Sequence, residues 1–157
     1  MRILVVCLGN ICRSPLGHGC LEHLVGEAGL DWEIDSAGTG NWHIGNMPDK
    51  RAIAIAKKNN IDISHQRARQ IQKEDFERFD HILVMDRQNY EDVLKLTEND
   101  EQRAKVRLFL GGDACVQDPY WDDSLFESVF NQIYDQSQNL ITGLRVLSGS
   151  KKAKYKH

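Results

Sequence analysis

The sequence predicts a three-layer α/β fold, in which a four-stranded parallel sheet is flanked by helices. Short apolar runs such as Ile3–Cys7 and His81–Met85 lack polar alternation, which is typical of strands buried on both faces. Between the strands lie segments with apolar residues at helical spacing, which favour right-handed crossovers. With 157 residues, 41% of them hydrophobic and 27% charged, residues 1–157 are expected to form one domain.

The first predicted strand, Ile3–Cys7, meets Gly9 and Asn10, and a helix is expected soon afterwards. Ser14 is the expected N-terminal cap of this helix, because Pro15 suits the first helical position. Apolar residues then recur every four positions, at Leu16, Cys20, Leu24 and Ala28, before Gly29 ends the helix.

The middle of the chain continues the alternation. A second strand is expected at Trp32–Ser36 and a helix at Asp49–Lys58. A linking loop at Ile61–Arg69 leads to a short turn near Glu74–Phe79 and then to the third strand, His81–Met85. Asp86 follows that strand and precedes a further helix.

The last third of the chain predicts one more strand and a long helix. The strand is expected at Lys105–Leu110, and a loop from Gly111 to Asp123 follows it. The long amphipathic helix carries Phe126, Val129, Phe130, Ile133, Leu140, Ile141 and Leu144. The basic tail at 151–157 is expected to be frayed and solvated.

Charge and composition exclude several classes of protein. The net charge of −3 disfavours nucleic-acid binding. The first apolar run, Ile3 to Leu8, is too short for a signal peptide or a membrane span, so we expect a cytoplasmic protein without a membrane partner. Three of the four cysteines, Cys7, Cys12 and Cys20, lie close together in the sequence, which favours reactive over structural roles.

The loop between Cys7 and Arg13 is the strongest functional signal. A short loop between a buried strand and a helix directs backbone N–H groups inward and forms an anion cradle at the helix N-terminus. The helix dipole and a nearby guanidinium both favour the thiolate form of Cys7. Because the carboxyl ends of parallel strands share one rim, the loops at Gly38 and Asp86 are expected beside this cradle.

The segment C-L-G-N-I-C-R-S-P, together with Asp118-Pro119-Tyr120-Trp121, closely resembles the low-molecular-weight protein tyrosine phosphatases. The resemblance extends to S-A-G-T-G-N-W-H-I-G from Ser36, D-I-S-H-Q-R-A-R-Q from Asp62 and F-D-H-I-L-V-M-D-R-Q-N from Phe79. It implies a Rossmann-like fold with four parallel strands. It also implies hydrolysis of phosphotyrosine and small aryl phosphates, an acid phosphatase activity, without metal or other cofactor.

The resemblance assigns the chemical roles. Cys7 would attack phosphorus and form a phosphocysteine intermediate, while Arg13 would hold two phosphate oxygens. Asp118, kept extended by Pro119, would protonate the leaving group and later accept a proton from the attacking water. The partners would be phosphotyrosine-containing proteins, and the product would be inorganic phosphate.

Further roles follow from the same resemblance. Ser14 would hydrogen-bond the Cys7 thiolate, and Asn10, Ser36 and His65 would brace the loop. The phosphate-binding loop would be formed by Leu8, Gly9, Asn10, Ile11, Cys12 and Ser14. Aromatic stacking favours aryl phosphates, and the walls of the cleft would be Leu8, Trp42, Tyr120 and Trp121.

The chain departs from the family pattern at Gly17, His18 and Gly19, where alanines and a glutamate are usual. Two glycines predict a first helix that is softer or more closely packed, with altered stability and retained activity. Cys12 has two open interpretations: a reversible disulfide with Cys7 that protects the nucleophile, or simple packing. A zinc site at Cys7, Cys12 and His18 lacks a fourth ligand at a usual spacing.

Three other functions are compatible with parts of the pattern. Arsenate reductases share the fold and loop but need further cysteines, and residues Asp86 to Leu96 contain none. A silent phosphate-binding module would have lost the nucleophile or the acid, whereas Cys7 and Asp118 are both present. A phosphoarginine phosphatase is the third possibility, and the Asn10-Ile11 pair favours tyrosine.

Overall fold

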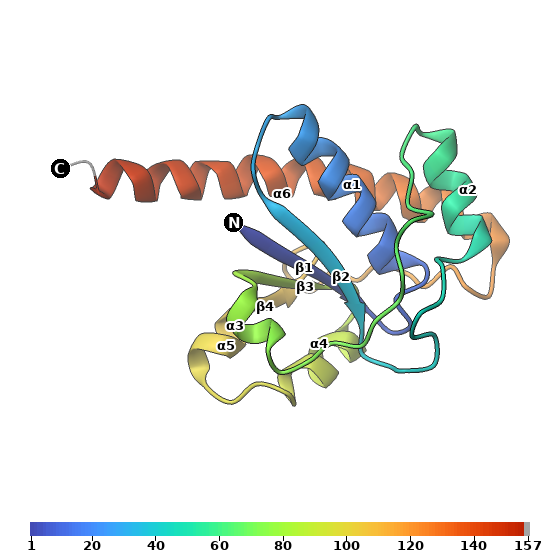
Figure 1. The fold of residues 1–157 in the computed structure, drawn as a ribbon, viewed down its shortest axis with the longest axis horizontal. Coiled ribbons are helices and arrows are strands. Elements are labelled where there is room, and N and C mark those ends of the chain that lie inside the picture. The colour runs from blue at the N-terminus through green and yellow to red at the C-terminus, as the bar shows by residue number, and fades with distance from the viewer. Residues whose placement is uncertain (156–157) are drawn as a thin grey trace.

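The computed structural model describes the backbone of residues 1–155 and the side chains of residues 1–148, and it confirms the predicted three-layer α/β fold (Figure 1). Its sheet is parallel throughout, with the strand order β2-β1-β3-β4. The strands are β1 (Arg2–Cys7), β2 (Glu33–Gly38), β3 (His81–Val84) and β4 (Val106–Leu108).

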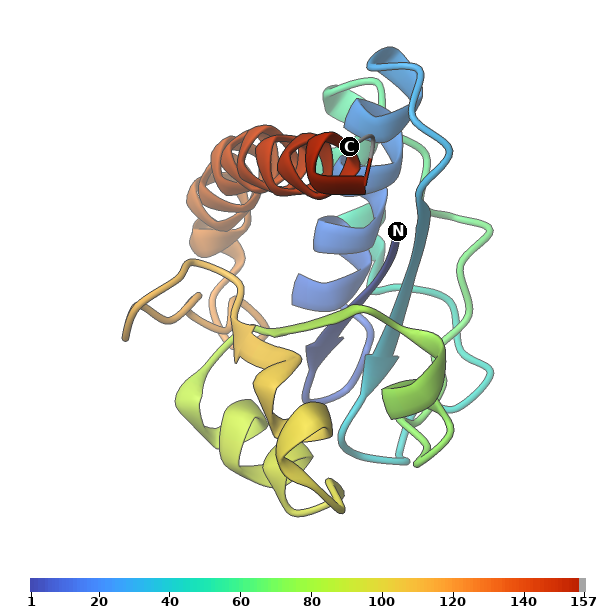
Figure 2. The same ribbon diagram turned by 90° about the vertical axis from the view of Figure 1, so that its left-hand side faces the viewer.

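Helices cover both faces of the sheet (Figures 1 and 2). One face carries α1 (Arg13–Glu27), α2 (Lys50–Lys58) and the long α6 (Phe126–Tyr155), and α1 packs against both β2 and α6. The other face carries α3 (Asp75–Arg78), α4 (Arg87–Leu94) and α5 (Asp100–Ala104). A short 3-10 helix, η1 (Asp123–Leu125), leads into α6.

The central strand β1 is buried on both faces, as its unbroken apolar run predicts. Ile3 and Val5 belong to the core beneath α1 and α6, whereas Leu4 and Val6 belong to a second core on the side of α3 and α4. Successive side chains of a strand point to opposite faces, so both layers depend on this one strand. Its last residue, Cys7, pairs with Gly38 at the carboxyl end of β2.

Several predicted boundaries differ from the observed ones. β2 continues to Gly38, past the expected end at Ser36, because Ala37 and Gly38 still pair with β1. α1 begins at Arg13 and Ser14 does not cap it, since the Ser14 hydroxyl contacts buried side chains instead. The expected frayed tail is helical as far as Tyr155, and residues 156–157 lie outside the described part of the chain.

The short helices α5 and η1 were not predicted. Both begin with a capping side chain that the sequence does contain. Asn99 accepts a hydrogen bond from the Gln102 backbone N–H, and Asp122 accepts one from the Ser124 backbone N–H. These caps are the signal by which the two helices could be found in the sequence.

Within residues 1–155, no helix combines the length and apolar character needed to cross a membrane.

The two unusual glycines of α1 mark close packing. A Cβ atom on Gly19 would lie 2.4 Å from Ile63 Cγ2, and one on Gly17 would lie 3.0 Å from both Val5 Cγ1 and Met85 Cε. The segment that contains Ile63 therefore approaches α1 more closely at Gly19 than any side chain would allow. The two glycines were expected to make the helix either softer or more closely packed, and the structure shows close packing.

We expect Gly19→Ala to destabilise the protein and Gly26→Ala, in the same helix, to stabilise it. Overpacking costs about 1–3 kcal/mol, whereas alanine gains about 1 kcal/mol over glycine in a helix. A Cβ on Gly26 meets no atom within 4 Å, so only the gain applies there. Denaturant unfolding of both variants measures the difference, and an equal stabilisation by both would contradict close packing at Gly19.

Candidate active site

The loop between β1 and α1 has a shape that the surrounding residues impose. Asn10 has a φ of 56°, in the left-handed region that most residues avoid. The loop also passes directly over Gly38, where a Cβ atom would lie 2.8 Å from the Leu8 carbonyl oxygen. The backbone N–H groups of Thr39 and Gly40 donate to the carbonyls of Cys7 and Leu8, so β2 holds the start of the loop.

The backbone N–H groups of this loop are available to a ligand. Within the described part of the chain, those of residues 8–13 donate no hydrogen bond to another protein group. The loop precedes α1, whose N-terminus carries the positive end of the helix dipole. Unpaired donors beside that dipole form the anion cradle that the sequence predicts.

Cys7 lies buried at the base of the loop with a hydroxyl beside its sulfur. The Cys7 Sγ and Ser14 Oγ atoms are 3.0 Å apart, as the resemblance implies. A hydroxyl that donates to a thiolate stabilises the charged form of the sulfur. Cys7 and the other three cysteines are free thiols in the structure.

Arg13 is buried and held by groups from two distant segments. Its Nη1 donates to Asp86 Oδ2 at 2.7 Å and to the Val116 carbonyl at 2.9 Å, while its Nη2 lies 3.7 Å from Asp118 Oδ2. Burial opposes its charge, but the charges of Cys7, Asp118 and Asp86 together raise the pKa of Arg13 above its ordinary value. The guanidinium is therefore fixed in place and charged.

Asp86 is a site residue that sequence reasoning left without a role. It caps α4 by accepting a hydrogen bond from the Asn89 backbone N–H through Oδ1, while Oδ2 accepts from Arg13. Its position two residues after β3, on the same rim as Cys7, was the available signal. One carboxylate thus links the orientation of Arg13 to the start of a helix.

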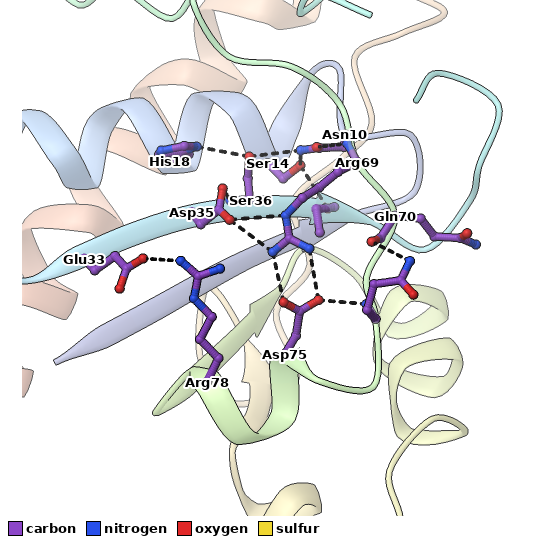
Figure 3. A network of polar contacts seen from close by, with 12 residues as sticks. Asn10, Ser14, His18, Glu33, Asp35, Ser36, Arg69, Gln70, Asp75 and Arg78 are labelled. Atoms are coloured by element: carbon purple, nitrogen blue, oxygen red, sulfur yellow. Dashed lines mark hydrogen bonds and ion pairs between the residues drawn. The ribbon is translucent and has the colours of Figure 1, made fainter. Parts of the chain in front are cut away.

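A buried polar network braces the loop from behind (Figure 3). Asn10 Nδ2 donates to Ser14 Oγ at 2.7 Å and to Ser36 Oγ at 3.1 Å, and Asn10 Oδ1 accepts from the Arg69 backbone N–H at 3.1 Å. These contacts match the bracing roles expected of Asn10 and Ser36. They hold the left-handed residue of the loop by three hydrogen bonds.

Among the described residues, the hydrogen bonds that brace the loop do not include His65, from which a bracing role was expected. A turn at residues 64–65 leaves His65 exposed, and the next residue, Gln66, faces α1 and donates to the Pro15 carbonyl. The histidine that reaches Ser36 is His18, whose Nδ1 lies 3.1 Å from Ser36 Oγ. The sequence places His18 four residues after Ser14, on the same face of α1, which was the signal for its position.

One pocket of about 290 Å³ gathers most of the predicted site. Its lining includes Cys7, Leu8, Gly9, Ile11, Cys12, Arg13, Trp42, Asp118, Tyr120 and Trp121, all of which were expected. His43 also lines it and was not expected. Asn10 and Ser14 do not line the pocket, because their side chains point into the network behind the loop. Trp42 and Trp121 are 68% and 88% exposed, so the walls end in an open aromatic rim.

Arg51 ties the segment that carries Asp118 to the start of α2. It forms ion pairs with Asp49 and Asp123, and its guanidinium lies 5.5 Å from the centre of the Tyr120 ring. Asp49 is itself attached to the nucleophile loop, because its backbone N–H donates a hydrogen bond to the Ile11 carbonyl. Arg51 thus holds Tyr120 and Asp123, which follow Asp118 in the same segment. Sequence reasoning missed Arg51 because these partners are distant in the sequence.

The cysteines differ in their environments. Burial, followed by the charges of Asp49 and Cys7, raises the pKa of Cys12 well above its ordinary value. Burial alone raises the pKa of Cys20 to about 12. Both side chains therefore remain protonated thiols near neutral pH, and a protonated thiol is a poor nucleophile.

We expect iodoacetamide at about pH 7 to label Cys7 in the folded protein and to leave Cys12 and Cys20 unmodified. A raised pKa keeps a thiol protonated until the pH approaches that higher value, so labelling of these two should appear only after unfolding. Peptide mapping by mass spectrometry measures the extent at each cysteine. Labelling of Cys12 in step with Cys7 would contradict this account of their environments.

The comparisons with known proteins agree with this geometry. The family described as low molecular weight phosphotyrosine protein phosphatase matches residues 2–150. A relative of that name from Schizosaccharomyces pombe is 40% identical over 92% of this chain and 97% of its own. One from Homo sapiens is 42% identical over 83% of this chain and 87% of its own.

Solved structures show the same fold. A protein tyrosine phosphatase from Entamoeba histolytica, crystallised with Hepes in its active site, has a TM-score of 0.88 and 29% identity, covering 94% of this chain and 99% of its own. A low molecular weight protein tyrosine phosphatase from T. tengcongensis has a TM-score of 0.84 and 28% identity. The match covers 91% of this chain and 99% of that protein's chain. The chain belongs to the low molecular weight phosphotyrosine protein phosphatase family and is an enzyme that hydrolyses phosphotyrosine.

Proposed function

We propose that the reaction proceeds through a phosphocysteine intermediate on Cys7. The observation that carries this proposal is the single pocket in which Cys7, Arg13 and Asp118 meet, with the Ser14 hydroxyl 3.0 Å from the sulfur. The thiolate attacks phosphorus in line with the leaving oxygen, so that an S–P bond forms as the P–O bond breaks. The leaving phenolate takes a proton from Asp118.

The second half of the reaction restores the enzyme. A water molecule attacks phosphorus, its proton passes to Asp118, and the S–P bond breaks to release inorganic phosphate and the Cys7 thiolate. Asp118 can take part in both transfers, because it lines the same pocket as Cys7 and its side chain is 40% exposed, so that water can reach it. One carboxyl group thus serves as acid first and as base afterwards.

Charge stabilisation in this scheme comes from the chain itself. The unpaired N–H groups of residues 8–13 and the Arg13 guanidinium supply fixed positive dipoles and charge for the phosphate oxygens. Phosphoryl transfer depends mainly on positioning and charge stabilisation, so this set of donors supports a reaction without a metal cofactor. The absence of a metal requirement remains a prediction, which assays in EDTA test.

The aromatic rim supports aryl phosphates as substrates. A phosphotyrosine side chain that reaches Cys7 would pass between Trp42 on one side and Tyr120 and Trp121 on the other. The finer substrate proposal is therefore protein phosphotyrosine together with small aryl phosphomonoesters, with acid phosphatase activity. A nucleophilic thiol works only while reduced, which favours action in the cytoplasm.

We expect Cys7→Ser to lower turnover of p-nitrophenyl phosphate by at least about three orders of magnitude in a buffer with EDTA. Serine lacks the readily formed anion of cysteine, so the first chemical step fails while the cradle remains. Calorimetry should still detect inorganic phosphate binding to this variant. Turnover that survives the substitution would contradict the mechanism, and wild-type turnover abolished by EDTA would contradict metal independence.

We expect Asp118→Ala to impair poor leaving groups more than good ones. Phenolate needs a proton in the transition state, whereas p-nitrophenolate needs little help, so the loss should be about 10²-fold or more for phenyl phosphate and smaller for p-nitrophenyl phosphate. Comparison of kcat/KM for the two substrates measures this. An equal loss for both would argue against the acid role, and arsenate reduction with thioredoxin would favour a reductase instead.

A further inference from the structure

His18 is a buried titratable side chain that the proposed mechanism does not use. It lies on α1 with 9% of its surface exposed, and Figure 3 shows it pointing at Ser36. Its Nδ1 is 3.1 Å from Ser36 Oγ, and its Nε2 is 3.4 Å from Glu22 Oε2. The imidazole therefore lies between a surface carboxylate and the network behind the nucleophile loop.

The direction of the hydrogen bonds in this network follows from what each atom can donate. The Arg69 backbone N–H donates to Asn10 Oδ1, so the amide group of Asn10 turns its Nδ2 toward the two serines. Each serine hydroxyl accepts one hydrogen from that nitrogen and keeps its own hydrogen to donate. The hydrogen of Ser14 has two acceptors within reach, Cys7 Sγ at 3.0 Å and the Ala37 carbonyl at 3.4 Å, and the sulfur is the nearer of the two.

The hydrogen of the Ser36 hydroxyl needs an acceptor of its own. Among the described residues, His18 Nδ1 is the one acceptor within hydrogen-bond distance of it. The hydrogen bond from His18 holds the pKa of Glu22 below its ordinary value, against the opposing effect of burial. A charged Glu22 favours the tautomer with the hydrogen on Nε2, which leaves Nδ1 free to accept.

We propose that His18 is a positioning residue for Cys7, acting through Ser36 and Asn10. By accepting the Ser36 hydrogen at Nδ1, it keeps the Ser36 oxygen free to accept from Asn10. Without that acceptor, the Ser36 hydrogen turns toward Asn10 and displaces the amide that orients Ser14. This inference rests on the proposed role of Cys7 as nucleophile and adds a residue to it.

Two substitutions of His18 separate its nitrogen atoms. Asparagine places a carbonyl oxygen near the site of Nδ1 and retains the contact with Ser36, whereas glutamine reaches the site of Nε2 and retains only the contact with Glu22. His23 offers a matched control, because it forms the same kind of pair with Glu27 in the same helix, at 3.0 Å. In the part of the chain whose side chains are described, His23 has no hydrogen bond or ion pair with the nucleophile loop or its network.

The experiment measures the reactivity of Cys7 directly. The rate at which iodoacetate labels the Cys7 peptide is followed by mass spectrometry as a function of pH, and kcat and KM for p-nitrophenyl phosphate are measured beside it. We expect His18→Gln to slow the labelling of Cys7 near pH 7 several-fold and to lower kcat about tenfold, with KM changed less. His18→Asn and His23→Gln should remain close to the wild type.

Two results would overturn the proposal. The first is a folded His18→Gln variant with the labelling profile and kcat of the wild type. The second is an equal loss in His18→Asn and His18→Gln that follows a lowered Tm, since that pattern indicates packing alone. Should His18→Gln fail to fold, Ser36→Ala removes the same link and should shift the labelling profile in the same direction. Failure of the proposed nucleophile is distinguishable, because it would appear as turnover by Cys7→Ser.

Discussion

The hydrogen bonds of one buried amide hold the nucleophile loop in its active shape. Asn10 adopts a left-handed backbone conformation, and its side chain joins the loop to the first turn of α1, to β2 and to the segment at Arg69. A buried polar group of this kind is costly unless every partner is present. The conformation of the loop, the N–H groups it offers to phosphate and the hydroxyl beside Cys7 therefore depend on one another.

The charged residues of the site are arranged around this loop by other parts of the fold. Arg13 is fixed by Asp86 after β3 and by the Val116 carbonyl, while Arg51 connects the start of α2 to the segment that carries Asp118. Each ion pair joins residues far apart in the sequence. A guanidinium that is already oriented loses less conformational freedom when it binds phosphate. These contacts therefore pre-organise Arg13 for phosphate binding.

The sequence predicted the fold class and the chemical centre of the site because both have strong local patterns. The unbroken apolar run of β1 and the spacing from Cys7 to Arg13 depend on few residues. Asp86 and Arg51 were missed because their partners are chosen by tertiary contacts. Ser14 shows how the fold decides between local alternatives, since its hydroxyl contacts Cys7 and Asn10 and does not cap α1.

His65 and His18 illustrate the same limit. The turn at residues 64–65 leaves His65 exposed, whereas the next residue, Gln66, is buried against α1. The family resemblance implied a bracing role for His65, whereas in this structure His18 of α1 lies against Ser36. In the same helix, Gly19 allows the close approach of Ile63. The departures from the family pattern at residues 17–19 therefore occur together in one turn of α1, where the glycines allow close packing and His18 contacts Ser36.

In this arrangement Asn10 acts on Cys7 through Ser14, and the two residues form one functional unit. A double-mutant cycle in kcat/KM with Asn10→Ala, Ser14→Ala and the combined variant tests this most directly. If the two residues act together, the combined variant should be little worse than the more impaired single variant. Losses that add fully in free energy would show that Asn10 and Ser14 act independently, and they would contradict the claim.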